Sequence, residues 1–143
     1  MRAARGLVRS ALHTWGMASF VPDALVAVSE LASNAVLHSG GPEIEVRVCR
    51  SGPDRVRIEV TDRSRFLPLH TLPQPDAESG RGLLLVDALA DRWGAVAVDG
   101  GKCVWAELSA HGQGQAPSPL ARMPHAPWPT VGGASNASSS RAK

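Results

Sequence analysis

The first part of the chain carries apolar side chains at helical spacing in two successive segments. Residues 2–15 and 22–39 show this period, and the arginines of the first segment lie on its polar side. Gly16 is a plausible end for the first helix. Pro22 and Asp23 are typical of the first turn of the second. The pattern therefore predicts two consecutive helices.

Two segments that follow alternate between apolar and polar residues, as half-buried strands do. The apolar positions are Ile44, Val46 and Val48 in the first segment and Val56, Ile58 and Val60 in the second. The four residues between the segments, 51–54, read Ser-Gly-Pro-Asp and favour a turn. We therefore expect an antiparallel hairpin.

A long connection, a third helix and a second pair of strands complete the pattern. Residues 63–80 contain three prolines, and structureless loops of this length are usually functional, often lids. The periodicity predicts a helix over 82–92 and strands over 95–99 and 102–109. Helices segregated from antiparallel strands indicate an α+β fold in two layers.

Composition separates a folded segment, residues 1–110, from a tail, residues 111–143. All 13 acidic residues precede the tail, which is rich in Pro, Gly, Ala and Ser. Such a tail buries too little apolar area to offset its ordering entropy, so we expect it to be disordered. The net charge of +2 comes from the tail, and no basic stripe indicates nucleic-acid binding.

Targeting and metal signals are weak. The chain shows no signal peptide and no run of 18 apolar residues, so we expect a cytoplasmic protein with no membrane span. Cys49 and Cys103 lack partners at zinc-ligand spacing, which argues against a zinc site.

The second helix carries a polar stripe among apolar residues. Glu30, Asn34 and His38 lie four residues apart, and the helix contains no Lys or Arg. Burying such groups unpaired costs roughly 1–3 kcal/mol each, which a bound ligand would relieve. An ordinary surface stripe, or polar groups paired inside the protein, remains the alternative.

Two further segments carry candidate binding groups. Asp62 ends the second strand on the face that Val60 shares, although an aspartate that starts a turn is an equal reading. The Ser-Gly-Arg-Gly segment 79–82 precedes the third helix. Its glycines allow close backbone approach and the helix N-terminus attracts anions, but a simple loop-to-helix turn explains it as well. The spacing of a Walker A motif is absent.

Together, over about residues 2–109, these segments resemble the histidine-kinase-like ATPases, and within them the anti-sigma-factor serine kinases of the actinobacterial type. Residues 30–38, Glu-Leu-Ala-Ser-Asn-Ala-Val-Leu-His, are similar to the N box, and Asp62 stands at the G1 aspartate. Residues 80–83 resemble the G2 box, and residues 101–108 resemble the closing strand. The resemblance implies the Bergerat fold, with helices on one face of a mostly antiparallel sheet.

The resemblance also implies roles in binding ATP and Mg²⁺. Glu30 would be the general base for a protein serine hydroxyl, Asn34 a magnesium ligand, and Asp62 the acceptor of the adenine amino group. His38 would line the pocket, and Lys102 takes the place of a threonine that supports adenine binding in relatives. Backbone amides at the start of the third helix would bind the phosphates: Gly80, Arg81, Gly82 and Leu83.

Besides Lys102, the chain departs from the family pattern at two further places. Arg63, Ser64, Arg65 and Phe66 follow Asp62, where relatives carry glycines. Relatives also have a strand before the first helix, whereas this chain begins almost inside that helix, so the sheet would lack an edge strand.

The functional reading is an ATP-dependent regulator that binds a sigma factor or a STAS-type antagonist, and that would phosphorylate the antagonist on serine. A non-catalytic interaction module is the alternative. The catalytic domain of a sensor histidine kinase ranks lower, because no helix with a phosphoacceptor histidine precedes the domain. Whether the protein is a homodimer stays open.

Overall fold

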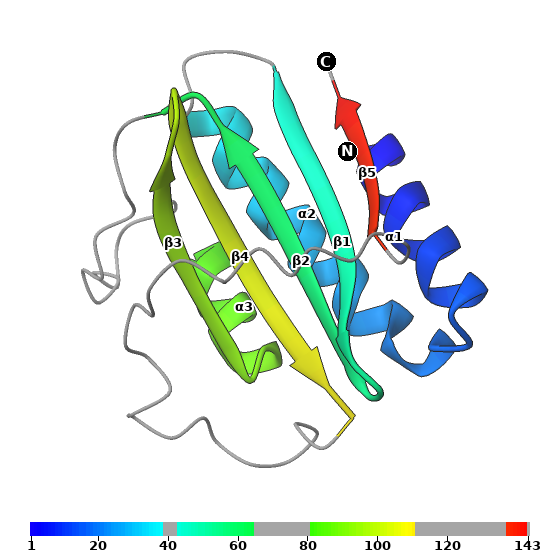
Figure 1. Ribbon diagram of the computed structural model, residues 1–143. Helices are drawn as coiled ribbons and strands as arrows, with labels where there is room; N and C mark the ends of the chain where they lie inside the picture. The colour runs from blue at the N-terminus through cyan, green and yellow to red at the C-terminus, as the bar shows by residue number, and fades with distance from the viewer. Residues whose placement is uncertain (39–42, 65–80, 111–136, 143) are drawn as a thin grey trace.

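The computed structural model describes residues 1–38, 43–64, 81–110 and 137–142. Within this part of the chain, three α-helices cover one face of a five-stranded antiparallel sheet (Figure 1). The elements are α1 (Arg2–Thr14), η1 (Ala18–Phe20), α2 (Val21–His38), β1 (Ile44–Gly52), β2 (Arg55–Asp62), α3 (Arg81–Leu89), β3 (Arg92–Val98), β4 (Gly101–Ser109) and β5 (Ala137–Ala142). The predicted α+β sandwich is confirmed.

The strand order is β3-β4-β2-β1-β5, so β2 lies between β4 and β1 in the sheet. The expected hairpin forms, with Val46 opposite Val60, and β4 pairs on the other side of β2, with Val104 opposite Val60. Residues directly opposite one another on paired strands point to the same face of the sheet, and for these valines it is the face that the helices cover. The core lies between this face and the helices, and the same parity carries Asp62 to its edge.

Helix α2 is the central element of the helical layer. Its buried residues are Ala24, Leu25, Ala27, Val28, Leu31, Ala32 and Ala35. Together with the preceding turn it forms the segment Ala18–His38, whose length and mean hydropathy of 1.4 would by themselves allow a membrane span. The packing of α2 between α1, α3 and the sheet accounts for this apolar character within the described fold.

The tail is where the sequence prediction was wrong. Residues 137–142 were expected to be disordered, but they form β5, which pairs antiparallel with β1 from Ile44 opposite Ala142 to Cys49 opposite Ala137. A strand edge offers a row of main-chain N–H and C=O groups, so pairing there needs no apolar side chain. The edge that we expected to be open is therefore covered, while residues 111–136 lie outside the described part.

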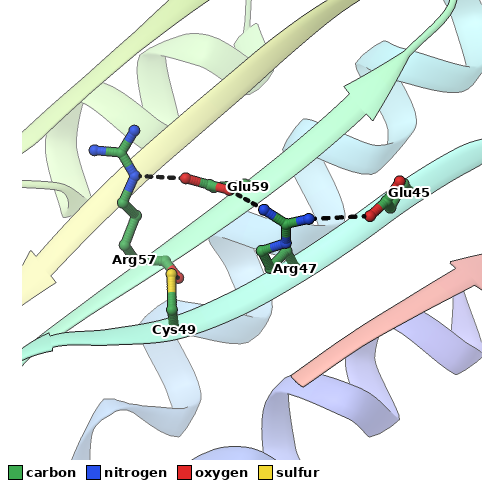
Figure 2. A network of polar contacts seen from close by, with 5 residues as sticks. All are labelled: Glu45, Arg47, Cys49, Arg57 and Glu59. Carbon is green, nitrogen blue, oxygen red and sulfur yellow. Dashed lines mark hydrogen bonds and ion pairs between the residues drawn. The ribbon is translucent and has the colours of Figure 1, made fainter. Parts of the chain in front are cut away.

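The sheet face opposite the helices carries charged residues joined in a chain (Figure 2). Arg47 lies 3.4 Å from Glu45 and 3.8 Å from Glu59, and Arg57 donates to Glu59 at 2.8 Å. The Arg57 guanidinium also stacks 4.0 Å from the ring centroid of Trp105 on β4. Contacts of this kind stabilise by about 0–1 kcal/mol each. They link β1, β2 and β4, and we assign them a structural role.

Candidate functional site

The start of α3 lies against the polar stripe of α2. A Cβ atom placed on Gly82 would stand 2.5 Å from Oε2 of Glu30 and 3.5 Å from Nδ2 of Asn34. Glycine is therefore the residue that lets the α3 backbone approach the Glu30 carboxylate this closely. The structure brings together three of the residues predicted for the site, which come from two motifs about fifty positions apart.

Asn34 carries a buried polar group for which the described residues provide no hydrogen-bond partner. Its Nδ2 atom is buried and forms no hydrogen bond with the described residues. An unsatisfied buried donor costs about 1–3 kcal/mol. A ligand that brings its own polar atoms would remove this cost, so the orphaned amide beside Glu30 fits a bound nucleotide.

The described residues contain no cluster of three or more His, Cys, Asp and Glu that could hold a metal ion. Magnesium in nucleotide sites typically takes one or two protein oxygens and completes its shell with phosphates and water. The Asn34 side-chain oxygen is a suitable hard donor for that role. The donor set therefore fits magnesium that arrives with a nucleotide better than a dedicated metal cage.

Asp62 lies at the end of β2, on the helix side of the sheet, and is only 3% exposed. Its Oδ1 atom accepts a hydrogen bond from the backbone N–H of Ser64 at 2.7 Å. Its Oδ2 atom lies 3.3 Å from Nζ of Lys102, although the two do not form a hydrogen bond of good geometry. One carboxylate oxygen of Asp62 is thus hydrogen-bonded within its own turn, and the other lies beside the ammonium group of Lys102.

Lys102 reaches Asp62 because β4 sets it directly opposite in the β2–β4 ladder. Both side chains are almost fully withdrawn from solvent, at 7% and 0% exposure for Lys102 and Asp62. A buried ion pair of this kind costs desolvation energy that its mutual attraction only partly offsets. An ammonium group therefore stands at the carboxylate that the family resemblance assigns to adenine.

Gly101 and Ser64 contribute to the site in ways that the sequence analysis did not predict. A Cβ atom on Gly101 would overlap the backbone carbonyl of Asp62, so β4 can pair this closely only with glycine at that position. Ser64 supplies the N–H that turns the chain after Asp62. A turn that starts at Asp62 was one of the two readings of this residue, and the Ser64 N–H closes that turn.

The structure gives the position of the remaining predicted site residues but no contact that tests their roles. His38 is exposed at the end of α2, and Leu83 is half-buried in α3. The backbone of Arg81 begins α3, as the proposed phosphate-binding amides require. Gly80 lies outside the described residues. The roles of these residues stay predictions.

Comparison with models of protein families matches residues 1–108 to the histidine kinase-like ATPase domain. Comparisons with curated proteins and with solved structures give no match. The matched region contains Glu30, Asn34, Asp62, Gly82 and Lys102 and covers about three quarters of the chain. On this match and on the two-layer architecture, the chain belongs to the histidine kinase-like ATPase domain family.

Proposed function

We propose that this chain is an ATP-binding regulator of the anti-sigma type and a protein serine kinase. The observation that carries the proposal is the Glu30 carboxylate held against Gly82 at the start of α3, beside the unsatisfied Asn34 amide. Phosphoryl transfer needs a proton acceptor and a set of amides that bind phosphates. A carboxylate next to a helix N-terminus provides both at one place. The partner would be a sigma factor, a STAS-type antagonist, or both.

In this proposal Glu30 accepts the proton of the attacking serine hydroxyl. The first amides of α3 hold the phosphates, because they have no partner within the helix. Asn34 contributes an oxygen to magnesium. When bound, Mg-ATP supplies the phosphoryl group and neutralises the charge that develops on it.

Replacing Glu30 by glutamine separates catalysis from binding. Glu30→Gln keeps the shape of the side chain and removes the basic carboxylate, so ATP affinity should stay near the parent value. Loss of a positioned general base typically lowers the rate by about 10²–10⁴-fold. Asn34→Ala is the contrasting variant, and it should lose the magnesium dependence of ATP binding because it removes a metal ligand.

The assay combines ATP titration, with and without Mg²⁺, and phosphorylation of purified STAS-domain proteins. A parent protein that binds no ATP would overturn the proposed function. Unchanged phosphoryl transfer by Glu30→Gln would assign the base to another group.

A non-catalytic interaction module is the second candidate, and the Asp62–Lys102 ion pair favours it. This pair gives the carboxylate an internal partner in the absence of nucleotide. A module that keeps the fold and transfers nothing would bind its partner equally well with and without ATP. A parent protein that binds both ATP and its partner but transfers no phosphate would establish this second candidate.

A further inference from the structure

We infer that Lys102 makes this pocket accept guanine as well as adenine nucleotides, because Asp62 and Lys102 together read the base through one acceptor and one donor. The inference rests on the proposed function, since it assumes that a nucleotide base reaches Asp62. It concerns which base is accepted. It starts from the 3.3 Å approach of Lys102 Nζ to Asp62 Oδ2 at a place where both side chains are withdrawn from water.

The pair is close but incompletely satisfied. Asp62 Oδ2 has no hydrogen-bond partner of good geometry within the described residues, and Asp62 is the ion-pair partner that they provide for Lys102. A carboxylate oxygen has two lone pairs, and an ammonium group has three N–H donors. Each group therefore keeps hydrogen-bonding capacity that the pair itself does not use.

The two purines differ in what they present at this edge. Adenine carries an amino donor at C6 next to an acceptor ring nitrogen, whereas guanine carries a carbonyl acceptor at C6 next to a ring N–H donor. A lone carboxylate that faces the group at C6 accepts from the amino group of adenine and repels the carbonyl of guanine. A carboxylate with an adjacent ammonium group matches either edge, since the donor and the acceptor need only exchange partners.

Because Lys102 is buried, its charge affects which base the site can bind. A base that engaged only Asp62 would draw the carboxylate away and leave the Lys102 ammonium without a counter-charge in a desolvated site. The guanine carbonyl and the adenine ring nitrogen both give that ammonium an acceptor. A hydroxyl group, which the family resemblance places here, is neutral and both donates and accepts, so it adds no preference for a carbonyl oxygen.

The test measures the affinities of the full-length parent for ATP and GTP with Mg²⁺. Two analogues complete the set: inosine triphosphate, which keeps the guanine carbonyl, and purine riboside triphosphate, which has no group at C6. We expect ATP, GTP and inosine triphosphate to bind within about tenfold of one another and purine riboside triphosphate to bind more weakly, because a well-placed pair of base contacts discriminates by about 1–3 kcal/mol. This series needs no variant and stands even if changes at Lys102 impair folding.

Lys102→Met should lower the affinity for GTP at least about tenfold more than the affinity for ATP, because it removes the donor and keeps the length of the side chain. Lys102→Arg is the matched control, since it keeps both the positive charge and the N–H donors, and its GTP-to-ATP ratio should stay near that of the parent.

A parent protein that binds ATP about a hundredfold more tightly than GTP would overturn the inference and leave the proposed function standing. So would a Lys102→Met variant with an unchanged GTP-to-ATP ratio. A parent protein that binds neither nucleotide would overturn the inference together with the proposed function.

Discussion

Gly82→Ala is expected to displace the Glu30 carboxylate while leaving the fold intact. The added Cβ would meet Oε2 of Glu30 at 2.5 Å, and no backbone atom is among its three nearest neighbours. Ordinary contact begins at 3.4 Å, so the carboxylate must retreat by about 1 Å, a misplacement that can lower an enzymatic rate about 10²-fold. The end of a glutamate side chain can move this far by rotation, so the structural cost is small.

The stability of the variant should even rise slightly. Alanine is favoured over glycine within helices by about 0.5–1 kcal/mol, and α3 includes Gly82 in its first turn. Gly6→Ala is the matched control, because Gly6 also lies in a helix and an added Cβ there would meet nothing within 4 Å. Both variants should melt at or above the parent temperature.

The assay compares the three proteins by thermal unfolding, ATP titration and phosphorylation of purified STAS-domain proteins. We expect Gly6→Ala to retain the transfer rate of the parent and Gly82→Ala to lose most of it. Parent-like transfer by Gly82→Ala would refute the placement of Glu30 as the base. Loss of cooperative unfolding in Gly82→Ala would mean that the Cβ meets rigid backbone rather than the side chain.

Three further outcomes can be checked. Gly101→Ala should fail to fold or melt far below the parent in thermal unfolding, because its Cβ would overlap the backbone carbonyl of Asp62, which rotation cannot relieve. Truncation after Ala110 should change the free energy of unfolding by only about 1 kcal/mol, because the entropy lost in ordering β5 nearly offsets the free energy of its hydrogen bonds. Light scattering should nevertheless show more self-association of the truncated protein, because the edge of β1 is then uncovered. Burial, and secondarily the Glu59 carboxylate, raises the pKa of the Cys49 and Cys103 thiols above 9.0, so iodoacetamide should modify them slowly in the folded protein and rapidly in urea. The pKa of each thiol is higher in the folded than in the unfolded state. The contribution of the two thiols to the free energy of unfolding is therefore fully present below about pH 9, and it should be lost as the pH rises through the folded-state pKa values.

The parts of the fold that the sequence predicted are those set by side-chain periodicity. The alternation around Val46 and Val60 predicted the hairpin, and the parity of Val60 placed Asp62 on the helix side, where it lies. The four-residue spacing of Glu30 and Asn34 predicted their shared face on α2. These inferences held because local repeats determine which side of an element is buried.

The missed features depend on approaches between distant segments. Nothing local to Gly82 or Gly101 shows that each faces a polar group from another element, at Glu30 and at Asp62. The ion pair of Lys102 likewise depends on the register between β2 and β4. The β5 strand was missed because its pairing is carried by the main chain, while its Ser-rich sequence carries no apolar pattern.

The position of β5 has a consequence for the order in which the protein folds. Its pairing joins the two segments of the sheet that lie furthest apart in sequence, Ile44–Cys49 and Ala137–Ala142, and contacts that close so long a loop form late. The other four strands precede this segment in the chain, so during synthesis they can assemble before it pairs. The nascent chain therefore carries an unpaired strand edge until translation of this segment is complete, and a product cut short in the tail would keep that edge exposed.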